Sequence, residues 1–438
     1  MRRKPWSRIR VADLVSSGDA EVKTGPFGTQ LHASDYVASG TPVINVRNIG
    51  FGGIRADKLE FIADETVQRL AGHVLRPGDI VFGRKGAVER HVLIRQAQNK
   101  WFQGSDCLRL RLKTKRVLPQ FLSYHLLTHD HQQWMMQQCS HGATMASLNQ
   151  DIVGRIEFLA PAPDEQYAIA SILSAYEDLI ENNTRRIAIL EEMARRIYEE
   201  WFVRFRFPGF EAVRMVESEL GLVPEGWVVD SLQGVCVAKI GVQTGPFGSQ
   251  LHKADYSDSG VPVLMPKDLI GFRIDEETVA RVPEPTADSL SRHRMRPGDI
   301  AYGRRGDIGR RAFIMAHQAG WLCGTGCLRI RPDAKRINPW YVFNYLGQDN
   351  VVGLIAGRAH GVTMPNLNAR LLESVPVLRP HSGLQDQFEA TTFPMAELRE
   401  SLIAKNRNLR TTRDLLLPKL ISGELDVSAL PEPEALAA

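Results

Sequence analysis

The sequence predicts an α+β fold, in which two similar globular α/β units are joined by two long helices that form an antiparallel coiled coil. Two observations predict this fold. The 438-residue chain repeats itself, with Thr24 matched by Thr244, 220 residues later. Each repeat is followed by a long segment whose apolar residues recur at alternating steps of three and four, which is typical of a helix packed lengthwise against another helix.

The repeat is plain in the residues themselves. The segment TGPFGTQLHASDYVASGTP at residues 24–42 recurs as TGPFGSQLHKADYSDSGVP at 244–262, with 13 of 19 positions identical. LRPGDIVFGRKG from Leu75 recurs as MRPGDIAYGRRG from Met295, and SHGATMASLN from Ser140 recurs as AHGVTMPNLN. We therefore expect a tandem repeat whose two copies are related by a pseudo-two-fold axis.

The first long helix is predicted over residues 161–206. Asp164 and Glu165 follow Pro163 and place acidic side chains in the first turn, while Pro208 and Gly209 end the helix. At ~1.5 Å per residue, roughly 40 helical residues make a rod of ~60 Å, too long for the core of one small domain, so the helix needs a partner helix. Its predicted seam residues are Ile169, Leu173, Tyr176, Ile180, Asn183, Ile187, Leu190 and Ile197.

The second long helix is predicted over residues 381–425, and Pro394 is expected to kink it or delay its start. Asn183 and Lys405 lie near the midpoints of the two helices, so antiparallel pairing would bring them to one level, where they could fix the register. Alternatively, Lys405 extends out to solvent. The predicted seam residues of this helix are Met395, Leu398, Leu402, Lys405 and Leu409.

These patterns divide the chain into five segments. The tail is rich in Ala, Pro and Glu and is expected to be disordered. The predicted boundaries are 1–160 for the first globular unit, 161–206 for the central helix, 207–380 for the second unit, 381–425 for the C-terminal helix and 426–438 for the tail.

Composition predicts a soluble cytoplasmic protein of two or more domains, with 43% hydrophobic and 24% charged residues. The net charge of +4 suggests a polyanionic partner only weakly. No run of 18 apolar residues and no signal peptide is seen, so no membrane contact is expected. The five scattered cysteines favour reduced thiols, and only Cys323 and Cys327 are close, so no metal site is expected.

No motif predicts catalysis by this chain itself. The sequence lacks a phosphate-binding GxxxxGK[ST] loop, HExxH, the G-x-S-x-G elbow, a dinucleotide-binding GxGxxG and the proline-proline-aromatic motif of adenine methylases. Asp35, Asp79 and their copies Asp255 and Asp299 each follow a turn signature, so we interpret them as turn- or loop-capping carboxylates. We expect no catalytic residue and no cofactor bound by this chain.

Three loops recur in both copies and are suited to approach a polyanion. In TGPFG[TS]QLH the glycines allow close approach of the backbone, and Gln can bond two atoms of an adenine edge. FGRKG and YGRRG place two cations between glycines, as phosphate contacts require, and HGATM and HGVTM give a small polar turn. The candidate DNA-binding residues are Thr24, Gln30, His32, Arg47, Asn48, Arg84, Lys85 and Thr144 in the first copy, and Thr244, Gln250, His252, Lys267, Asp268, Arg304, Arg305 and Thr363 in the second.

A structural role is the alternative for each loop, since Phe27 and Phe247 could pin a hairpin and Arg84 or Lys85 could be merely solvated. Retention of the whole set in both copies favours nucleic-acid contact. Phosphate contacts need not change with DNA sequence, whereas base contacts do. We therefore expect the divergent positions to read bases: Arg47 and Asn48 against Lys267 and Asp268, residues 89–91 against 309–311, and 146–147 against 365–366.

Over nearly its whole length the chain resembles the specificity (S) subunits of type I restriction-modification systems. The resemblance is carried by TGPFGTQLH and its copy, PAPDEQYAIASILSAYEDLIENNTRRIAILEEMARRIYEEWFV at residues 161–203, LGLVPEGW at 220–227 and LLLPKLISGELDV at 415–427. The chain departs from the family pattern at Pro394 and in its shortened segment before Trp6. The resemblance implies two target recognition domains, each reading one half of a split DNA site, and a helical spacer between them.

The resemblance also implies partners. These are double-stranded DNA, two modification subunits that carry out N6-adenine methylation, and restriction subunits that translocate and cut DNA. S-adenosylmethionine, ATP and Mg would belong to those partner subunits. A coiled-coil scaffold and a stand-alone DNA-modifying enzyme are the alternatives. Because the two copies are so alike, we expect the half-sites to share bases.

Overall fold

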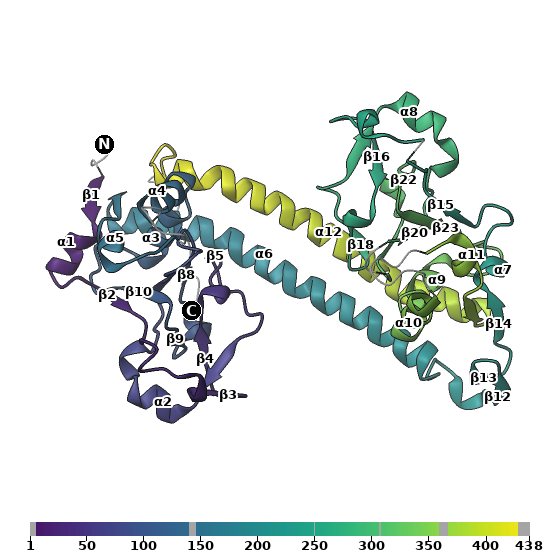
Figure 1. Cartoon of the computed structure of the whole chain (residues 1–438), viewed down its shortest axis with the longest axis horizontal. Helices are drawn as coiled ribbons and strands as arrows, with labels where there is room; N and C mark the ends of the chain where they lie inside the picture. Colours follow the sequence, from purple (N-terminus) through teal and green to yellow (C-terminus); the bar gives the residue numbers. More distant parts are fainter. Residues whose placement is uncertain (1–5, 140–145, 249, 306–307, 359–366, 428–438) are drawn as a thin grey trace. The chain divides into compact units, whose positions relative to one another are not determined.

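A computed structural model describes residues 6–139, 146–248, 250–305, 308–358 and 367–427 of the chain (Figure 1). The chain divides into two compact units, which we call unit 1 (Met1–Thr184 with Ala404–Ala438) and unit 2 (Arg185–Ile403). Both units mix helices with sheets, as the sequence predicts. The five segment boundaries given above remain a prediction.

Unit 1 contains a five-stranded and a four-stranded sheet. One strand of each is fully buried: β7 (Ile80–Gly83) in the first and β9 (Phe102–Gln103) in the second. Strand β10 (Cys107–Leu112) alternates: Leu108 and Leu110 face the apolar core, while Arg109 and Arg111 lie on the opposite face. The five-stranded sheet has the order β2 (Ala20–Thr24), β10 (Cys107–Leu112), β7 (Ile80–Gly83), β8 (His91–Leu93), β5 (Phe51–Gly52). The four-stranded sheet has the order β3 (Tyr36–Val37), β6 (Glu60–Ile62), β4 (Thr41–Ile44), β9 (Phe102–Gln103).

Short helices complete unit 1. Phe121 and Leu122 of α3 (Pro119–Leu126) pack into the same apolar core as the five-stranded sheet and the long helices. The helices are α1 (Val11–Ser16), α2 (Asp64–Arg69), α3 (Pro119–Leu126), α4 (His129–Cys139) and α5 (Gln150–Gly154), and β1 (Ser7–Arg10) pairs with β11 (Glu157–Ala160).

Unit 2 repeats this design. Leu328 pairs with Thr244 across two strands of unit 2, as Leu108 pairs with Thr24 in unit 1, so the strand register itself is duplicated. The sheets are β15 (Val242–Thr244), β23 (Cys327–Ile330), β20 (Ile300–Gly303), β21 (Arg311–Phe313); β19 (Ala280–Val282), β16 (Val261–Leu264), β22 (Leu322–Cys323); β17 (Leu269–Ile270) with β18 (Arg273–Ile274); β14 (Val228–Ser231) with β24 (Pro376–Arg379); and β12 (Met215–Ser218) with β13 (Gly221–Pro224). The helices are α7 (Leu232–Val235), α8 (Glu284–Ser289), α9 (Pro339–Tyr345), α10 (Asp349–Arg358) and α11 (Ala369–Glu373).

Two long helices, α6 (Pro163–Tyr198) and α12 (Ser382–Ile421), contribute to both units and pair antiparallel within each. In unit 1 the start of α6 packs with the end of α12 in one core, which includes Leu173 and Leu420. In unit 2 the end of α6 packs with the start of α12, where the rings of Tyr198 and Phe388 lie 5.6 Å apart. The antiparallel pairing of the fold prediction is thus confirmed.

The expected delay of the second helix at Pro394 is wrong. Helix α12 already begins at Ser382 and runs through Pro394, whose ring is exposed. Leu384 and Phe388, both buried on the preceding turns, anchor this part of the helix, and their packing offsets the hydrogen bond that proline removes.

The seam of α12 also differs from the prediction. All eight predicted seam residues of α6 are buried or half-buried, as are Met395, Leu402 and Leu409 of α12. Leu398 and Lys405, however, are exposed, so their assignment to the seam is wrong.

The polar residue that faces α6 is Asn406, one position after Lys405. Asn183 Nδ2 donates to Asn406 Oδ1 at 2.9 Å, and Asn406 is buried. The steps along α12 therefore run four then three from Phe388, rather than three then four. An amide can be buried here because its partner amide satisfies it, which the Lys405 ammonium could not achieve opposite Asn183.

Among the described residues, no helix is long and apolar enough to cross a membrane.

Candidate nucleic-acid interface

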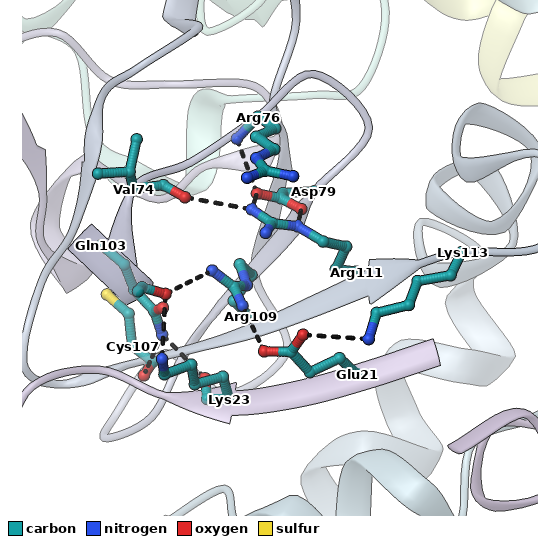
Figure 2. Close-up of polar contacts among 11 residues, drawn as sticks. Glu21, Lys23, Val74, Arg76, Asp79, Gln103, Cys107, Arg109, Arg111 and Lys113 are labelled. Atoms are coloured by element: carbon teal, nitrogen blue, oxygen red, sulfur yellow. Dashed lines mark hydrogen bonds and ion pairs between the residues drawn. The ribbon is translucent and has the colours of Figure 1, made fainter. Parts of the chain in front are cut away.

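A buried ion pair underlies the loops of each unit. In unit 1, Arg111 Nε and Nη2 each donate to one carboxylate oxygen of Asp79 at 2.6 Å (Figure 2). In unit 2, Arg331 Nε and Nη2 donate in the same way to the two carboxylate oxygens of Asp299, at 2.7 and 2.6 Å. Asp79 also accepts the backbone N–H of Arg76 at 2.8 Å, as a turn-capping carboxylate does. The predicted structural role of these aspartates is confirmed, and each bidentate pair fixes the strand beneath the loops.

The first glycine of each TGPFG loop is required by the fold. A Cβ on Gly25 would lie 2.0 Å from the carbonyl oxygen of Gly104, and a Cβ on Gly245 would lie 1.9 Å from that of Gly324. These glycines therefore allow two segments of the protein backbone to approach each other closely. This packing alone requires glycine, whether or not the loop also contacts DNA.

The aromatic tips of these loops are exposed, with Phe27 60% and Phe247 56% accessible. Neither ring is packed in a core, so burial does not support the structural alternative, in which the two phenylalanines pin a hairpin. The candidate site residues named from sequence did not include Phe27 and Phe247. Their signal in the sequence is an aromatic residue flanked by glycines, in a loop that is repeated almost unchanged.

The histidines that follow these tips cap short 3-10 turns, η1 (Ala33–Asp35) and η7 (Lys253–Asp255). The backbone N–H of His32 donates to Asp35 at 2.7 Å, and that of His252 donates to Asp255 at 2.6 Å. The His32 N–H, together with Arg69, holds the pKa of Asp35 below its usual value. Both imidazoles remain exposed.

The two glutamines of these loops differ in their surroundings. The Gln30 side chain is exposed, and its backbone carbonyl accepts from Arg69 at 2.6 Å. Gln250 Oε1 accepts from the backbone N–H of Phe247 at 3.2 Å and from Arg292 at 3.3 Å. Gln250 is thus oriented by the protein, whereas Gln30 is held only through its backbone.

Two of the expected base-reading residues are buried and structural. Asn48 is 0% exposed and donates to the carbonyls of Arg55 and Asp57 at 3.0 and 3.2 Å. Asp268, also 0% exposed, accepts the Met265 N–H at 2.9 Å. The prediction that these two side chains read bases is wrong, because each satisfies the buried backbone of its own loop.

The residues beside them remain accessible. Arg47 pairs with Glu60 at 2.6 Å, and both side chains are nearly half exposed. Lys267 donates to Asp268 at 2.9 Å and to the Thr278 carbonyl at 2.5 Å, with most of its side chain in solvent. Either cation could exchange its present partner for a DNA group, since surface ion pairs are weak.

The second divergent set is also partly buried. His91 lies in the core with Nε2 2.8 Å from Ser123 Oγ, and burial lowers the pKa of His91 to about 3. Arg311, at the equivalent position, is buried, and its Nε donates to the Phe343 carbonyl at 2.7 Å. The expectation that these two residues read bases is therefore wrong.

The arginine-lysine loop lies against the segment that follows the third loop. In unit 1, Leu148 N–H donates to the Arg84 carbonyl at 2.8 Å, and Lys85 forms a β-bridge with Ser147. In unit 2, Leu367 N–H donates to the Arg304 carbonyl at 3.0 Å. The arginine-lysine loop thus lies against residues 147–148 in unit 1 and against Leu367 in unit 2. Thr144 and Thr363, predicted in the third loop, lie outside the described residues, as do residues 365–366.

Their cations differ in availability. Lys85 lies 3.3 Å from Asp106, with both side chains about half exposed. Arg304 Nε donates to the Leu367 carbonyl at 2.7 Å, and burial and neighbouring Arg305 lower the pKa of Arg304. Arg305 is exposed. Lys85 and Arg305 are therefore better placed than Arg304 for a phosphate contact.

The start of the TGPFG loop also contacts this part of unit 1. Gln150 Nε2, just after the third loop, donates to Thr24 Oγ1 at 3.0 Å. The TGPFG loop and the arginine-lysine loop, which are far apart in the sequence, therefore both contact residues 147–150 in unit 1. Thr244 holds the equivalent place at the end of β15.

Within the described part of the chain, no group of three or more His, Cys, Asp or Glu side chains could hold a metal ion. The five cysteines are buried free thiols, and burial raises the pKa of Cys107 and of Cys323 to about 12.

Comparisons with known proteins agree with this architecture. Residues 41–192 match the family model described as type I restriction modification DNA specificity domain. The type I restriction enzyme MjaIX specificity subunit of Methanocaldococcus jannaschii is 25% identical over 316 residues, 72% of this chain and 71% of the relative. The HindI specificity subunit of Haemophilus influenzae is 24% identical over 446 residues, covering 87% of this chain and 94% of the relative.

A solved structure supports the fold. The crystal structure of the S subunit of a type I restriction-modification system from M. genitalium has a TM-score of 0.64 at 16% identity, and the match covers 98% of both chains. At that identity the likeness bears on the fold alone. The family match over residues 41–192 and the relatives agree: over most of its length the chain is similar to the specificity subunits of type I restriction-modification systems.

Proposed function

We propose that this chain selects the duplex DNA sequence on which a type I restriction-modification complex acts, with each globular domain reading one half of a split target. The observation that carries the proposal is the duplication of the loops together with their support. In both units the same loops stand on the same buried ion pair, Arg111 with Asp79 and Arg331 with Asp299. Two equivalent recognition surfaces suit two half-sites.

Retained and divergent residues are assigned different roles. The exposed cations Lys85 and Arg305 contact phosphates, which position a protein on DNA without reading its sequence. Gln30 and Gln250 approach base edges. Arg47 and Lys267 occupy equivalent positions with different side chains, and they discriminate between the two half-sites.

The domain boundaries carry over into the proposal. Residues 1–160 and 207–380 are the target recognition domains, and the helices at 161–206 and 381–425 form the spacer. A helical spacer of fixed length sets the number of unread base pairs between the half-sites, which for two equivalent groove faces is about one turn of duplex, ~34 Å.

This chain is the non-catalytic part of the complex. Two modification subunits dock on its helices and supply S-adenosylmethionine binding and N6-adenine methylation. Restriction subunits, where present, supply the ATP- and Mg-dependent steps. All of these cofactors belong to the partner subunits.

Methylation mapping tests the proposal. DNA exposed to this chain together with its modification subunit is expected to carry N6-methyladenine in two short half-sites separated by a fixed gap. Because the domains are so similar, the half-sites, read on opposite strands, are expected to share bases. Wholly unrelated half-sites would contradict that likeness.

Two results would favour the alternatives. A coiled-coil scaffold would show no steep fall of duplex affinity with salt, whereas a DNA-binding chain must, because bound phosphates release counterions. A stand-alone enzyme would methylate or cut DNA without any partner subunit.

A further inference from the structure

Unit 2 contains a cavity of about 580 Å³, which we call the arginine pocket, between strands β15 and β23 and the 3-10 turn η9 (Ser291–His293). No aspartate or glutamate of the described chain lines it. In the sequence its signal is SRHRMR, with three alternating arginines where the first copy has AGHVLR. The lining arginines are Arg292, Arg294, Arg296, Arg329 and Arg331.

Only two of these arginines are paired with carboxylates. Arg331 is bound to Asp299, and Arg294 lies 2.6 Å from Glu284 and 2.8 Å from Asp288. Within the described chain, no carboxylate lies within ion-pair distance of the remaining three, Arg292, Arg296 and Arg329. The pocket therefore carries an excess of positive charge.

Arg329 differs from its counterpart in unit 1. Arg109 Nη2 lies 2.7 Å from the carboxylate of Glu21 (Figure 2), which supplies its counter-charge. Arg329 is just as buried, at 2% exposed, yet its Nη2 donates to the neutral Gln243 Oε1 at 2.7 Å. The place of Glu21 is taken by Gly241.

No side chain can take over from Glu21 at that place. A Cβ on Gly241 would lie 2.4 Å from the Cβ of Cys236, so the local backbone excludes a carboxylate there. A buried guanidinium without a counter-charge is unfavourable, because its lost hydration is only partly replaced by neutral acceptors. Unit 2 thus lacks an anion that unit 1 supplies from its own chain.

The residues around Arg329 increase the excess of positive charge. Unit 2 has Arg292 and Arg294 at the positions of Gly72 and Val74 in the first copy. Arg292 Nε donates to His293 Nε2 at 2.9 Å, which requires that nitrogen to be unprotonated. Burial, together with Arg292 and Arg329, lowers the pKa of His293 to about 4, as expected near uncompensated positive charge.

We propose that the arginine pocket binds a phosphate group of the DNA backbone, a contact that the first recognition domain does not make. The inference rests on the proposed function and adds a position-specific contact to it. Arg292 also donates to Gln250 at 3.3 Å, so the pocket adjoins the repeated loop assigned to DNA. Arg292 and Arg296 are exposed to solvent, and a phosphate can accept hydrogen bonds from several guanidinium donors at once.

Two variants of the full-length chain, assembled with its modification subunit, test the pocket. Arg292→Gly introduces the residue of the first copy, Gly72. Gln243→Glu places a carboxylate of the same shape on Arg329. Each is expected to lower the slope of log affinity against log salt by about one, and to weaken target and unrelated duplexes alike by about tenfold. The methylated sequence is expected to remain the same, because a phosphate contact reads no base.

Controls separate binding from folding. Arg214→Ala removes an exposed arginine elsewhere in unit 2 and is expected to leave the salt slope unchanged. Gln243→Glu is expected to leave the thermal midpoint unchanged or raised, since the new carboxylate neutralises Arg329.

The outcomes distinguish the two proposals. Native salt-dependent binding with unchanged slopes in both variants would overturn the pocket assignment. Absence of salt-dependent duplex binding by the native complex would instead overturn the proposed function. Inorganic phosphate provides the last arm: thermal stabilisation of the native chain by phosphate alone, with unchanged DNA slopes, would assign the pocket to a free anion and overturn the DNA contact.

Discussion

Three histidines distinguish unit 1 from unit 2. Burial lowers the pKa of His91 to about 3, that of His125 to about 4 and that of His131 to about 3. The rings of His125 and His131 lie 5.3 Å apart, and charging of either opposes charging of the other. Arg311, Tyr345 and Val351 hold the equivalent positions in unit 2. Unit 1 should therefore be the more acid-sensitive of the two.

The sign follows from proton uptake. Each histidine has a folded pKa below its unfolded value of about 6.5, so the unfolded state binds more protons in acid. This contribution to stability is fully present above about pH 6.5 and is lost as the pH falls towards the folded pKa values. At pH 5 each histidine is expected to destabilise unit 1 by about 2 kcal/mol.

His131→Val introduces the residue of the second copy. It is expected to remove one histidine's contribution to the loss of unit 1 stability in acid. Hydrogen exchange of the α3 amides at pH 7.5 and pH 5, corrected for intrinsic rates, measures it. His129→Gln changes an exposed histidine and serves as the matched control. Equal acid loss in the native chain and in His131→Val would count against the assignment.

At the residue scale, sequence identified the loops better than the roles of their side chains. The capping role of Asp35 and Asp79 was predictable, because turn signatures are local. The burial of Asn48 and Asp268 was not, since their hydrogen-bond partners include carbonyls and N–H groups positioned only when the loop folds. The difference between Asn48 and Asp268 therefore reflects two sets of hydrogen bonds that stabilise the same loop, and not two base preferences.

At the scale of elements, the Asn183–Asn406 pair fixes the level at which α6 and α12 meet in unit 1. Asn406 also donates to the Ile180 carbonyl at 3.3 Å and to Thr184 Oγ1 at 3.2 Å. A buried amide that is satisfied only in one alignment disfavours every shifted alignment, because a shift would leave it unpaired.

Asn406→Leu is expected to destabilise unit 1 by about 1–3 kcal/mol, since Asn183 loses its partner in a buried seam. The double variant Asn183→Leu with Asn406→Leu is expected to recover much of that loss, because two leucines pack well at a seam. Urea unfolding of the four members of this double-mutant cycle gives the coupling energy. Lys405→Ala, at the exposed neighbouring position, is expected to change stability by less than about 0.5 kcal/mol, and a larger effect there would restore Lys405 to the seam.

The long helices were predictable because their apolar period extends over many turns, so single exceptions do not hide it. The phase of α12 was not. Its apolar residues Met395, Leu402 and Leu409 belong to both phases, so steps of three-four and four-three fit almost equally well. Only the partner helix distinguishes them, by burying Asn406 opposite Asn183. Pro394 was misjudged for a related reason, since tertiary packing outweighed a local signal.

At the scale of the whole molecule, duplication has preserved the scaffold and changed its charges. The Arg–Asp pair, the capped turns and the strand register are the same in both units. Glu21 and Lys23 of unit 1 have become Gly241 and Gln243 in unit 2, and the adjoining turn has gained arginines. The two recognition domains are therefore expected to differ in how strongly they bind backbone as well as in the bases they read.

If α6 and α12 act as the spacer, their length should determine the width of the unread gap between the half-sites. Inserting four residues after Thr184 in α6 and four before Ala404 in α12 lengthens both helices by about one turn, ~6 Å, close to two base pairs of duplex. Methylation mapping is expected to show the same half-sites with a wider unread gap, because no recognition residue has moved within its domain. Insertion into α6 alone is the matched control; it mismatches the paired helices and is expected to abolish methylation at the split target. An unchanged gap with both insertions in place would show that something other than helix length sets the spacing.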